Sequence, residues 1–351
     1  MEAKKHFAPT AKEQLPGDSK HPFRRILCAG AFFVMILLAS YAHAAEQTIV
    51  DDLFGVNFIS AKEGWVSGRA GAIYHTADGG VTWQLQKTNT DITLGSVFFL
   101  DANNGWAVGD ASTILHTRDG GKTWVKQNCP VPFFYLMDVH FVSPTRGWIV
   151  TEKTHILATD NGGETWSVQF QDQDFILKSL SFSDPLNGWA VGEYGYTYHT
   201  VDGGAHWKHE SGFYGIDEMT GEIKGANYLF GVTAVNAKKA WAVGIDGTVV
   251  KTDDGGKSWK AIPNPAGRAM FTSVATDGAA AVVIAGKDGL LISADDGKTW
   301  SKPSFQPALG YQWLYRVGRI PNVGFAVVGA QGSIYLSNRN GSVYMGHQKN
   351  K

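Results

Sequence analysis

The sequence predicts an all-β fold, a seven-bladed β-propeller whose blades each contain four antiparallel strands. The first observation is a segment of the form Thr-x-Asp-Gly-Gly-x-Thr-Trp, an Asp box, which runs from Thr76 to Trp83 and recurs along the chain. The aromatic residues that end its seven copies are 41, 42, 41, 52, 41 and 44 residues apart, a spacing typical of propeller blades. The second observation is a Gly-Trp motif 18 residues before the box tryptophan, as in Gly105-Trp106 and Trp124.

Each repeat has room for four strands. Val97 and Phe99 show the period-two alternation of a strand that faces a core, and in the second repeat we expect strands at Gly95–Leu100, Gly105–Val108, Thr113–Thr117 and Thr123–Gln127. Residues 45–351 divide into seven units of about 44 residues, which leaves no room for a second domain. The sequence leaves open whether blade seven closes with its own outer strand, Ser342–Gly346, or with Thr48–Val50.

We interpret the Asp boxes as folding devices in the turn between the third and fourth strands. The Asp can accept hydrogen bonds from the N–H groups that follow it, the glycines permit positive φ, and the Trp covers the hairpin. The box carboxylates lie one per blade around the rim, so they cannot converge on one substrate or metal ion. The third box has Asn161 in place of Asp. The seventh copy, Ser337–Tyr344, matches the pattern poorly and has Arg339 at the Asp position, and an arginine side chain cannot make this turn. The predicted structural residues are Asp78, Trp83, Asp119, Trp124, Asn161, Trp166, Asp202, Trp207, Asp254, Trp259, Asp295 and Trp300.

The first 44 residues have the three parts of a secretory signal peptide. A basic segment ends at Arg25, an apolar run spans Ile26–Ala39, and Ala42-His43-Ala44 has small residues where a signal peptidase cleaves. We therefore expect a signal peptide over residues 1–44, with an uncleaved anchor as the alternative. The propeller over residues 45–351 is then exported to the periplasm or the extracytoplasmic membrane surface.

The bulk composition excludes several classes of protein. The formal charge is −1, and residues 45–351 carry 25 basic and 29 acidic side chains, so we expect no nucleic-acid binding. Cys129 is the only cysteine after the leader, so no intrachain disulfide forms. No metal-ligand spacing, phosphate-binding loop or Ser/His/Asp element is present, and we expect no metal, cofactor or catalytic residue. Histidines recur at one position of the third strand and are interpreted as repeat residues: His75, His116 and His199.

Strand direction separates the loops onto two faces. Turns between strands two and three share one face with the connections between blades, and this face is freer to vary than the Asp-box face. The connection from blade four to blade five, His209–Leu229, is longer than the others by about eleven residues and carries aromatic and acidic side chains, which favours recognition of a partner. The candidate partner-binding residues are Arg69, Glu193, Tyr194, Tyr214, Asp217, Glu218, Tyr228, Arg268, Trp313 and Arg316.

The repeat resembles that of the photosystem II stability/assembly factor family of seven-bladed propellers. The resemblance rests on Gly105-Trp106-Ala107-Val108-Gly109, Thr113-Ile114 and the Asp box, and it covers residues 45–351. It implies a non-enzymatic scaffold that helps a membrane protein complex to assemble, in the thylakoid lumen if the host is photosynthetic. The chain departs from the family in its bacterial-type leader and in the absence of a concentrated arginine patch, since Arg69, Arg268 and Arg316 meet only if the ring brings them together.

Two alternatives use the same repeats. Asp boxes also occur in sialidases and related glycosidases, and Arg319-Ile320-Pro321 is similar to a sialidase element, although it falls in the last blade rather than before the first box. Such an enzyme also needs an arginine triad, a tyrosine nucleophile and an acid/base Asp. A propeller that binds a glycan without cleaving it could use Tyr214, Trp313 and Tyr315 as stacking platforms.

Overall fold

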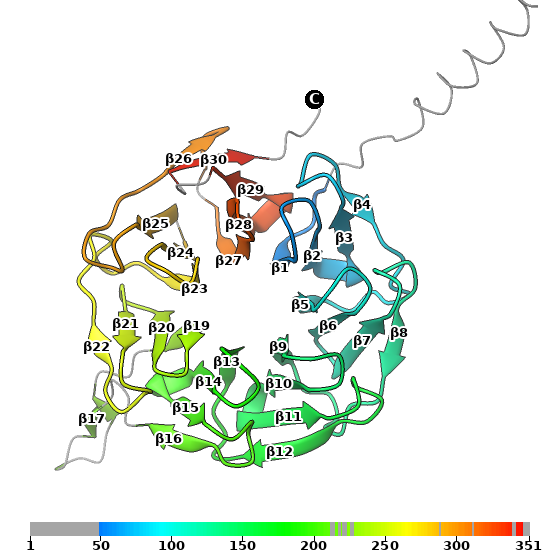
Figure 1. The fold of residues 1–351 in the computed structure, drawn as a ribbon, viewed down its shortest axis with the longest axis horizontal. Coiled ribbons are helices and arrows are strands. Elements are labelled where there is room, and N and C mark those ends of the chain that lie inside the picture. The colour runs from blue at the N-terminus through cyan, green and yellow to red at the C-terminus, as the bar shows by residue number, and fades with distance from the viewer. Residues whose placement is uncertain are drawn as a thin grey trace, which may run out of the picture. The chain divides into compact units, whose positions relative to one another are not determined.

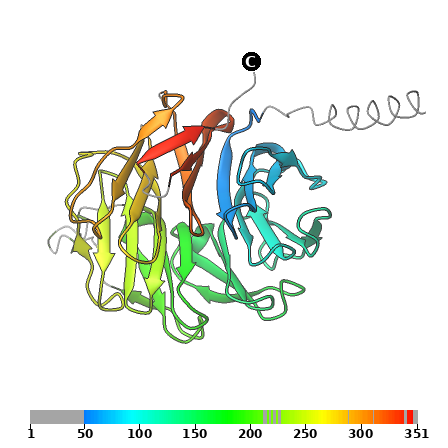
Figure 2. The same cartoon turned by 45° about the horizontal axis from the view of Figure 1, so that its top comes forward.

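The computed structural model describes residues 49–210, 215–216, 219, 223–224, 228–287, 289–310, 312–338 and 342–346. These residues form seven blades in a ring, which confirms the predicted seven-bladed propeller (Figures 1 and 2). The predicted signal peptide and three of the candidate residues, Tyr214, Asp217 and Glu218, lie outside the described residues. Within the described ranges, no helix has both the length and the apolar character needed to cross a bilayer.

The strands repeat in the same order in each blade. The inner strands are β1 (Leu53–Phe58), β5 (Leu94–Phe99), β9 (Leu136–Phe141), β13 (Leu177–Phe182), β19 (Leu229–Asn236), β23 (Phe271–Thr276) and β27 (Leu314–Ile320). The second strands are β2 (Gly64–Gly68), β6 (Gly105–Gly109), β10 (Gly147–Thr151), β14 (Gly188–Gly192), β20 (Lys239–Gly244), β24 (Val282–Gly286) and β28 (Gly324–Gly329). The third strands are β3 (Ile73–Thr76), β7 (Thr113–Thr117), β11 (His155–Thr159), β15 (Thr197–Thr200), β21 (Val249–Thr252), β25 (Gly289–Ser293) and β29 (Ile334–Ser337).

The outer strands vary in length from two to five residues. They are β4 (Gln84–Leu85), β8 (Val125–Gln127), β12 (Ser167–Gln171), β16 (Lys208–Glu210), β22 (Lys260–Ala261) and β30 (Val343–Gly346). Four of the turns between the second and third strands contain a short 3-10 helix, at Arg69–Gly71, Glu152–Thr154, Glu193–Gly195 and Ala330–Gly332. A small hairpin in the connection between blades four and five consists of β17 (Gly215–Ile216) and β18 (Ile223–Lys224).

Blades six and seven depart from the expected four strands. The sheet of blade six has three strands, whereas that of blade seven has five, because β26 (Ser304–Gln306) pairs in parallel with β30. Blade seven is closed by its own outer strand, β30, which answers the question left open by the sequence, and residues 49–50 lie in no strand. The ends of the ring are joined by a backbone hydrogen bond of 2.8 Å from the N–H of Gly332 to the carbonyl of Asp51.

The Gly-Trp and Asp-box motifs meet in a stack that joins neighbouring blades. The wholly buried Trp106 lies flat on Phe141 of blade three, with ring centroids 3.5 Å apart, and its other face stacks on His116 at 4.5 Å. The box residue Trp166 contacts Phe141 edge-on. The same Trp–Phe–Trp arrangement recurs between blades one and two and between blades three and four. Burial in this stack, and to a smaller extent the charge of Arg118, lowers the pKa of His116 to about 4, so this repeat histidine is a neutral packing residue.

The glycine of the Gly-Trp motif is required by this stack. A Cβ on Gly147 would lie 2.5 Å from the ring of Phe141, much closer than carbon atoms pack. Blade five has Ala240 in place of the glycine and Ala234 in place of the phenylalanine. In blade five, the glycine and the phenylalanine are therefore both replaced. This is expected if the glycine is needed only where the phenylalanine ring occupies the space of a Cβ.

The Asp-box turn is built from hydrogen bonds to the Asp carboxylate. Asp119 accepts from the hydroxyl of Thr123 at 2.7 Å and from its N–H at 2.8 Å. These two bonds are the main reason why the pKa of Asp119 is lowered to about 2. Asn161 forms the same turn, since its side-chain oxygen accepts from the N–H of Thr165 at 3.0 Å and its amide donates to the hydroxyl of Thr165 at 2.8 Å.

The seventh box corrects the sequence interpretation. Alignment of Ser337–Tyr344 with the other boxes placed Arg339 at the Asp position. The structure instead uses Asn338, whose side-chain oxygen accepts from the N–H of Ser342 at 3.0 Å, while its amide donates to the hydroxyl of Ser342 at 3.2 Å. The separation of four residues equals that between Asp119 and Thr123, so the same pair of hydrogen bonds forms with the acceptor one residue earlier than expected.

Candidate partner-binding face

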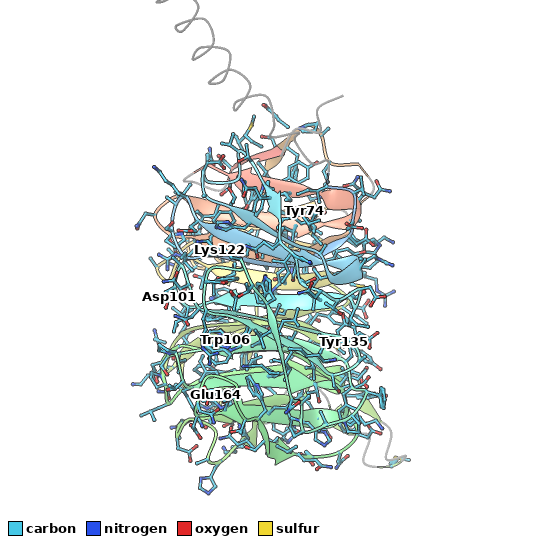
Figure 3. The ribbon with its side chains drawn as sticks, turned by 90° about the vertical axis from the view of Figure 1, so that its right-hand side faces the viewer. Tyr74, Asp101, Trp106, Lys122, Tyr135 and Glu164 are labelled. Atoms are coloured by element: carbon cyan, nitrogen blue, oxygen red, sulfur yellow. The ribbon has the colours of Figure 1, made fainter. Side chains whose placement is uncertain are left out.

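The turns between the second and third strands lie on one face together with the connections between blades, and we call it the connection face. The N–H at the start of such a turn donates to the carbonyl just before the inner strand, as from Asp110 to Thr93 at 3.1 Å. The Asp boxes form the other face. Figure 3 shows the ring from the side, with Lys122 and Glu164 of the box loops toward one face and Tyr135 of a blade connection toward the other.

The first aromatic patch on the connection face consists of Phe175, Tyr194 and Tyr228. The ring of Tyr194 lies 5.1 Å from that of Phe175 and 5.2 Å from that of Tyr228. A hydrogen bond to Tyr194 raises the pKa of Tyr228, and the Glu193 carboxylate accepts from the N–H of Ile176 at 3.1 Å. The propeller fold thus brings together the candidates Glu193, Tyr194 and Tyr228. Tyr194 has a positive φ, but so do the matching turn residues of other blades, so the conformation belongs to the repeat.

The second aromatic patch lies over the junction of blades seven and one and consists of Phe54, Trp313 and Tyr315. The rings of Trp313 and Tyr315 are nearly parallel with centroids 6.2 Å apart, and Phe54 lies 5.0 Å from Tyr315. All three rings are half-buried. The candidate Arg69 forms an ion pair with Asp52 at 2.9 Å, and both charges act on Tyr315, whose pKa is raised mainly by burial.

The three candidate arginines do not form one patch. Arg268 is 91% exposed, and its Nε lies 3.6 Å from Asp246 at the blade five–six junction. Arg69 has its own partner, Asp52, in blade one. Arg316 lines the central channel rather than the rim. The ring therefore leaves the arginines in separate ion pairs.

Arg316 reaches across the channel from blade seven to Asp138 of blade three. Its Nη2 lies 2.7 and 2.9 Å from the two carboxylate oxygens. The Asp138 side chain is only 1% exposed and also accepts from the hydroxyls of Ser96 and Ser179 at 2.8 and 2.9 Å. These groups adjoin a cavity of about 300 Å³ that inner strands of all seven blades line. The guanidinium group of Arg316 is therefore engaged inside the ring.

The position that Asp138 and Arg316 occupy in their inner strands holds a small residue in the other five blades. Ser179 accepts from the N–H of Val232 in the next blade at 3.4 Å, and Ser273 accepts from the N–H of Val317 at 3.2 Å. These side chains pair with N–H groups on the inner edge of a neighbouring blade, which would otherwise lack a partner. The five small residues are Gly55, Ser96, Ser179, Gly231 and Ser273.

Sequence reasoning missed two features of the connection face. Phe133, in the connection between blades two and three, is 86% exposed; the signal in the sequence was an aromatic pair, Phe133-Phe134, directly after Pro132. Lys287 lies with its Nζ 5.7 Å from the centroid of the Trp313 ring, which places a cation over the second aromatic patch.

Comparison with known proteins identifies the family. The family described as photosynthesis system II assembly factor YCF48 matches residues 40–130, 128–211 and 219–350. The chain belongs to this family. The match extends over all seven blades, so the family assignment rests on the same repeats that build the ring. No curated protein matches the chain.

Solved structures add relatives of the same fold. A structure of YCF48 bound to a D1 peptide matches with a TM-score of 0.67 and 22% identity, over 82% of this chain and 94% of that one. YCF48 from Cyanidioschyzon merolae matches with a TM-score of 0.67 and 20% identity, over 82% and 96%. The GH74 xyloglucanase from Xanthomonas campestris matches with a TM-score of 0.66 and 13% identity, over 86% of this chain but 55% of the enzyme. At these identities the likeness establishes the shared propeller fold.

Proposed function

We propose that this chain is an exported, non-enzymatic assembly factor that binds part of a membrane protein complex on the extracytoplasmic side. The observation that carries the proposal is membership of the YCF48 family over the whole described ring, because one solved YCF48 holds a D1 peptide. The signal-like pattern of residues 1–44 supports export.

The connection face supplies the binding surface in this proposal. Its two aromatic patches, around Tyr194 and around Trp313, are half-buried, and the rings within each patch lie next to one another. Aromatic side chains dominate the binding energy of protein interfaces because they bury a large area with few rotatable bonds. The exposed Phe133 adds a third apolar contact.

The channel supports a role without catalysis. Glycoside hydrolysis by the common mechanism uses two carboxyl groups that flank the scissile bond. The buried channel carboxylate, Asp138, has both oxygens engaged by Arg316 and by two serine hydroxyls. Arg319, part of the Arg-Ile-Pro segment that is similar to a sialidase element, lies in the same inner strand as Arg316. The likeness to GH74 enzymes is one of fold alone.

The test is site-specific photo-crosslinking in the native host. A photoreactive residue at Tyr194 should capture one membrane complex, whereas the same residue at Lys122 on the Asp-box face should not. Capture of the same proteins from both positions would contradict a defined face, and capture of no membrane protein would contradict the proposal. A glycan array and a hydrolysis assay on the purified protein distinguish the two glycan alternatives, since only binding without turnover fits a lectin-like propeller.

A further inference from the structure

The outer strand of blade six stops after one residue pair. Ile292 and Ser301 exchange two backbone hydrogen bonds of 2.9 Å. The next pair able to exchange both bonds is Leu290 and Pro303, since such pairs alternate in an antiparallel ladder. Proline has no N–H and cannot donate to the ladder. In blade two the residue that matches Pro303 is Gln127, and there the pairing continues.

The chain then leaves blade six. Residues from Ser304 onward form β26, which pairs with β30 of blade seven. In the described part of the chain, no other strand pairs with the outer edge of β25 beyond Ile292. The outward N–H and C=O of Leu290 therefore lie at an open sheet edge, which is a template for one more strand.

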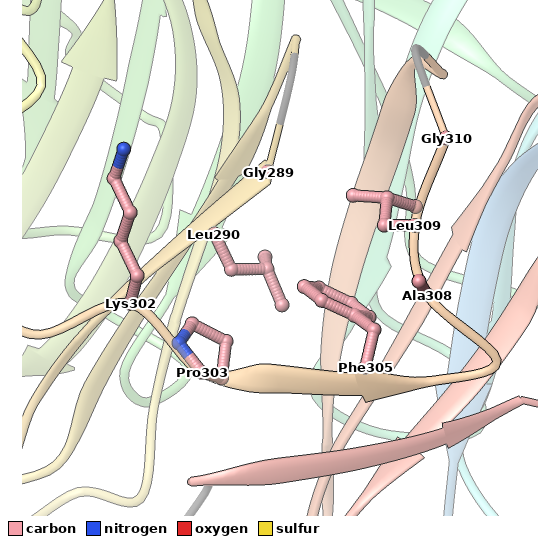
Figure 4. Close-up of a pocket in the computed structure, with 8 residues that line it drawn as sticks. All are labelled: Gly289, Leu290, Lys302, Pro303, Phe305, Ala308, Leu309 and Gly310. Atoms are coloured by element: carbon pink, nitrogen blue, oxygen red, sulfur yellow. The ribbon is translucent and has the colours of Figure 1, made fainter.

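Two cavities flank this edge. The first, of about 540 Å³, lies on the side of blade seven and is lined by Leu290, Phe305 and Leu309 (Figure 4). The second, of about 710 Å³, includes Leu291, which packs on the opposite side of the sheet with the connection from blade five, and Trp313. Successive side chains of a strand point to opposite faces, so a strand added at this edge would place its side chains alternately toward the two cavities.

The described charged side chains that line the two cavities are basic, and one of them, Arg268, is paired with Asp246 outside the lining. The described residues that line the two cavities include Arg268, Lys287 and Lys302 and no carboxylate. A complementary ligand carries acidic groups. The C-terminal residues of this chain, 347–351, include two lysines and no acid. Their positive charge does not complement the basic groove formed by the open edge of β25 and its two cavities.

We propose that an extended, acidic peptide of a partner protein binds here by strand addition to β25, as a fourth strand of blade six. An apolar side chain of the peptide occupies the cavity formed by Leu290, Phe305 and Leu309, and a carboxylate lies near Lys302. The inference rests on the proposed function, because it names the surface and the peptide chemistry through which a membrane protein client is held.

The test uses the purified full chain and a fluorescein-labelled peptide of eight alternating Glu and Val residues, followed by fluorescence anisotropy. We expect Lys302→Glu to weaken binding at least tenfold and Lys298→Glu, in the Asp box of the same blade, to leave it unchanged. A peptide N-methylated at every second residue, on the side that faces β25, should bind at least tenfold more weakly because it lacks the N–H donors of a strand. Equal binding by Lys302→Glu, or by the methylated peptide, overturns strand addition at this edge.

Photo-crosslinking in cells separates this inference from the proposed function. A photoreactive residue at the exposed Ala308, beside the first cavity, should capture the client. Capture from Tyr194 without capture from Ala308 refutes the groove but leaves the proposed function intact. Peptide binding that depends on Lys302, with no membrane client captured from either position, supports the groove and contradicts the proposed function.

Discussion

Replacement of both Asp138 and Arg316 by serine should cost much less stability than the sum of the two single replacements. In Asp138→Ser, the guanidinium group of Arg316 keeps its charge in the channel, where the side chain is 27% exposed, and the hydroxyl of Ser96 loses its acceptor. In Arg316→Ser, a carboxylate that is 1% exposed loses its counter-ion. Removal of one partner of a buried ion pair lowers the free energy of unfolding by about 3–5 kcal/mol, and the partial exposure of Arg316 places these variants near the lower limit.

The double variant has a small residue at this inner-strand position in all seven blades, as the other five blades already do. Serine suits this position, since Ser179 and Ser273 each accept an N–H from the next blade. We expect each single variant to lose about 3 kcal/mol and the double variant about 3 kcal/mol rather than about 6, a coupling of about 3 kcal/mol. For a ring of this size, 1 kcal/mol shifts the Tm by roughly 2 °C.

Thermal and urea unfolding at pH 7, followed by tryptophan fluorescence, measure this cycle. Burial, partly offset by the charge of Asp138 and reinforced by that of Arg316, lowers the pKa of the neighbouring His140 to about 4, so this side chain is neutral at pH 7 in the wild type. Arg268→Ser removes an exposed arginine and serves as the matched control, with a negligible change expected. Strict additivity, with the double variant melting roughly 12 °C below the wild type, would refute the coupling across the channel.

Three further predictions follow from the repeats. Gly147→Ala should lower the free energy of unfolding by about 2 kcal/mol through its clash with Phe141, but should cost almost nothing in a Phe141→Ala background; urea unfolding of all four proteins measures this, and equal losses in both backgrounds would rule out the clash. Asp119→Asn should keep the turn, as Asn161 does, whereas Asp119→Ala loses about 1 kcal/mol. Because the pKa of folded Asp119 is about 2 against about 3.9 when unfolded, its stabilisation is complete above pH 4 and is lost as the pH falls toward 2, so acid titration followed by circular dichroism should show a shallower loss for Asp119→Asn than for the wild type. His116 has a folded pKa of about 4 against about 6.5 when unfolded, so protonation favours unfolding as the pH falls from 6.5 toward 4; His116→Leu should lose less stability over this range, by on the order of 2 kcal/mol, and identical slopes for both proteins would contradict this.

The blades could be predicted because each repeat carries its own complete signal. Gly105-Trp106 and Phe99 occupy adjacent strands, and the Asp box closes the next hairpin of the same blade, so local spacing defined the fold. The first aromatic patch was also predictable, since Glu193 and Tyr194 lie in one turn and Tyr228 ends the connection to the next blade. In every blade a backbone hydrogen bond holds the turn next to the residue before the inner strand, as from Glu193 to Ile176 at 3.0 Å and from Ile245 to Tyr228 at 3.0 Å.

Contacts that depend on exact register could not be predicted. Arg316 and Asp138 lie 178 residues apart, and each follows a register irregularity near the start of its inner strand, which no sequence motif marks. In the seventh box the acceptor moved by one residue to Asn338, because no tryptophan fixed the alignment. In blade six, Pro303 was visible in the sequence, but the alternative partner of the following strand, β30, lies in another blade.

The open edge of blade six is compatible with a stable ring. The backbone hydrogen bonds that blade six forgoes are replaced by those between β26 and β30 in blade seven. An unpaired edge invites aggregation, and proteins commonly protect such edges with lysine or proline. Lys302 and Pro303 lie beside the open edge of β25, so the lysine that discourages pairing with a basic strand is also the residue that, in our proposal, selects an acidic strand. Protection of the edge and recognition of an acidic peptide therefore place the same demand on this part of the sequence.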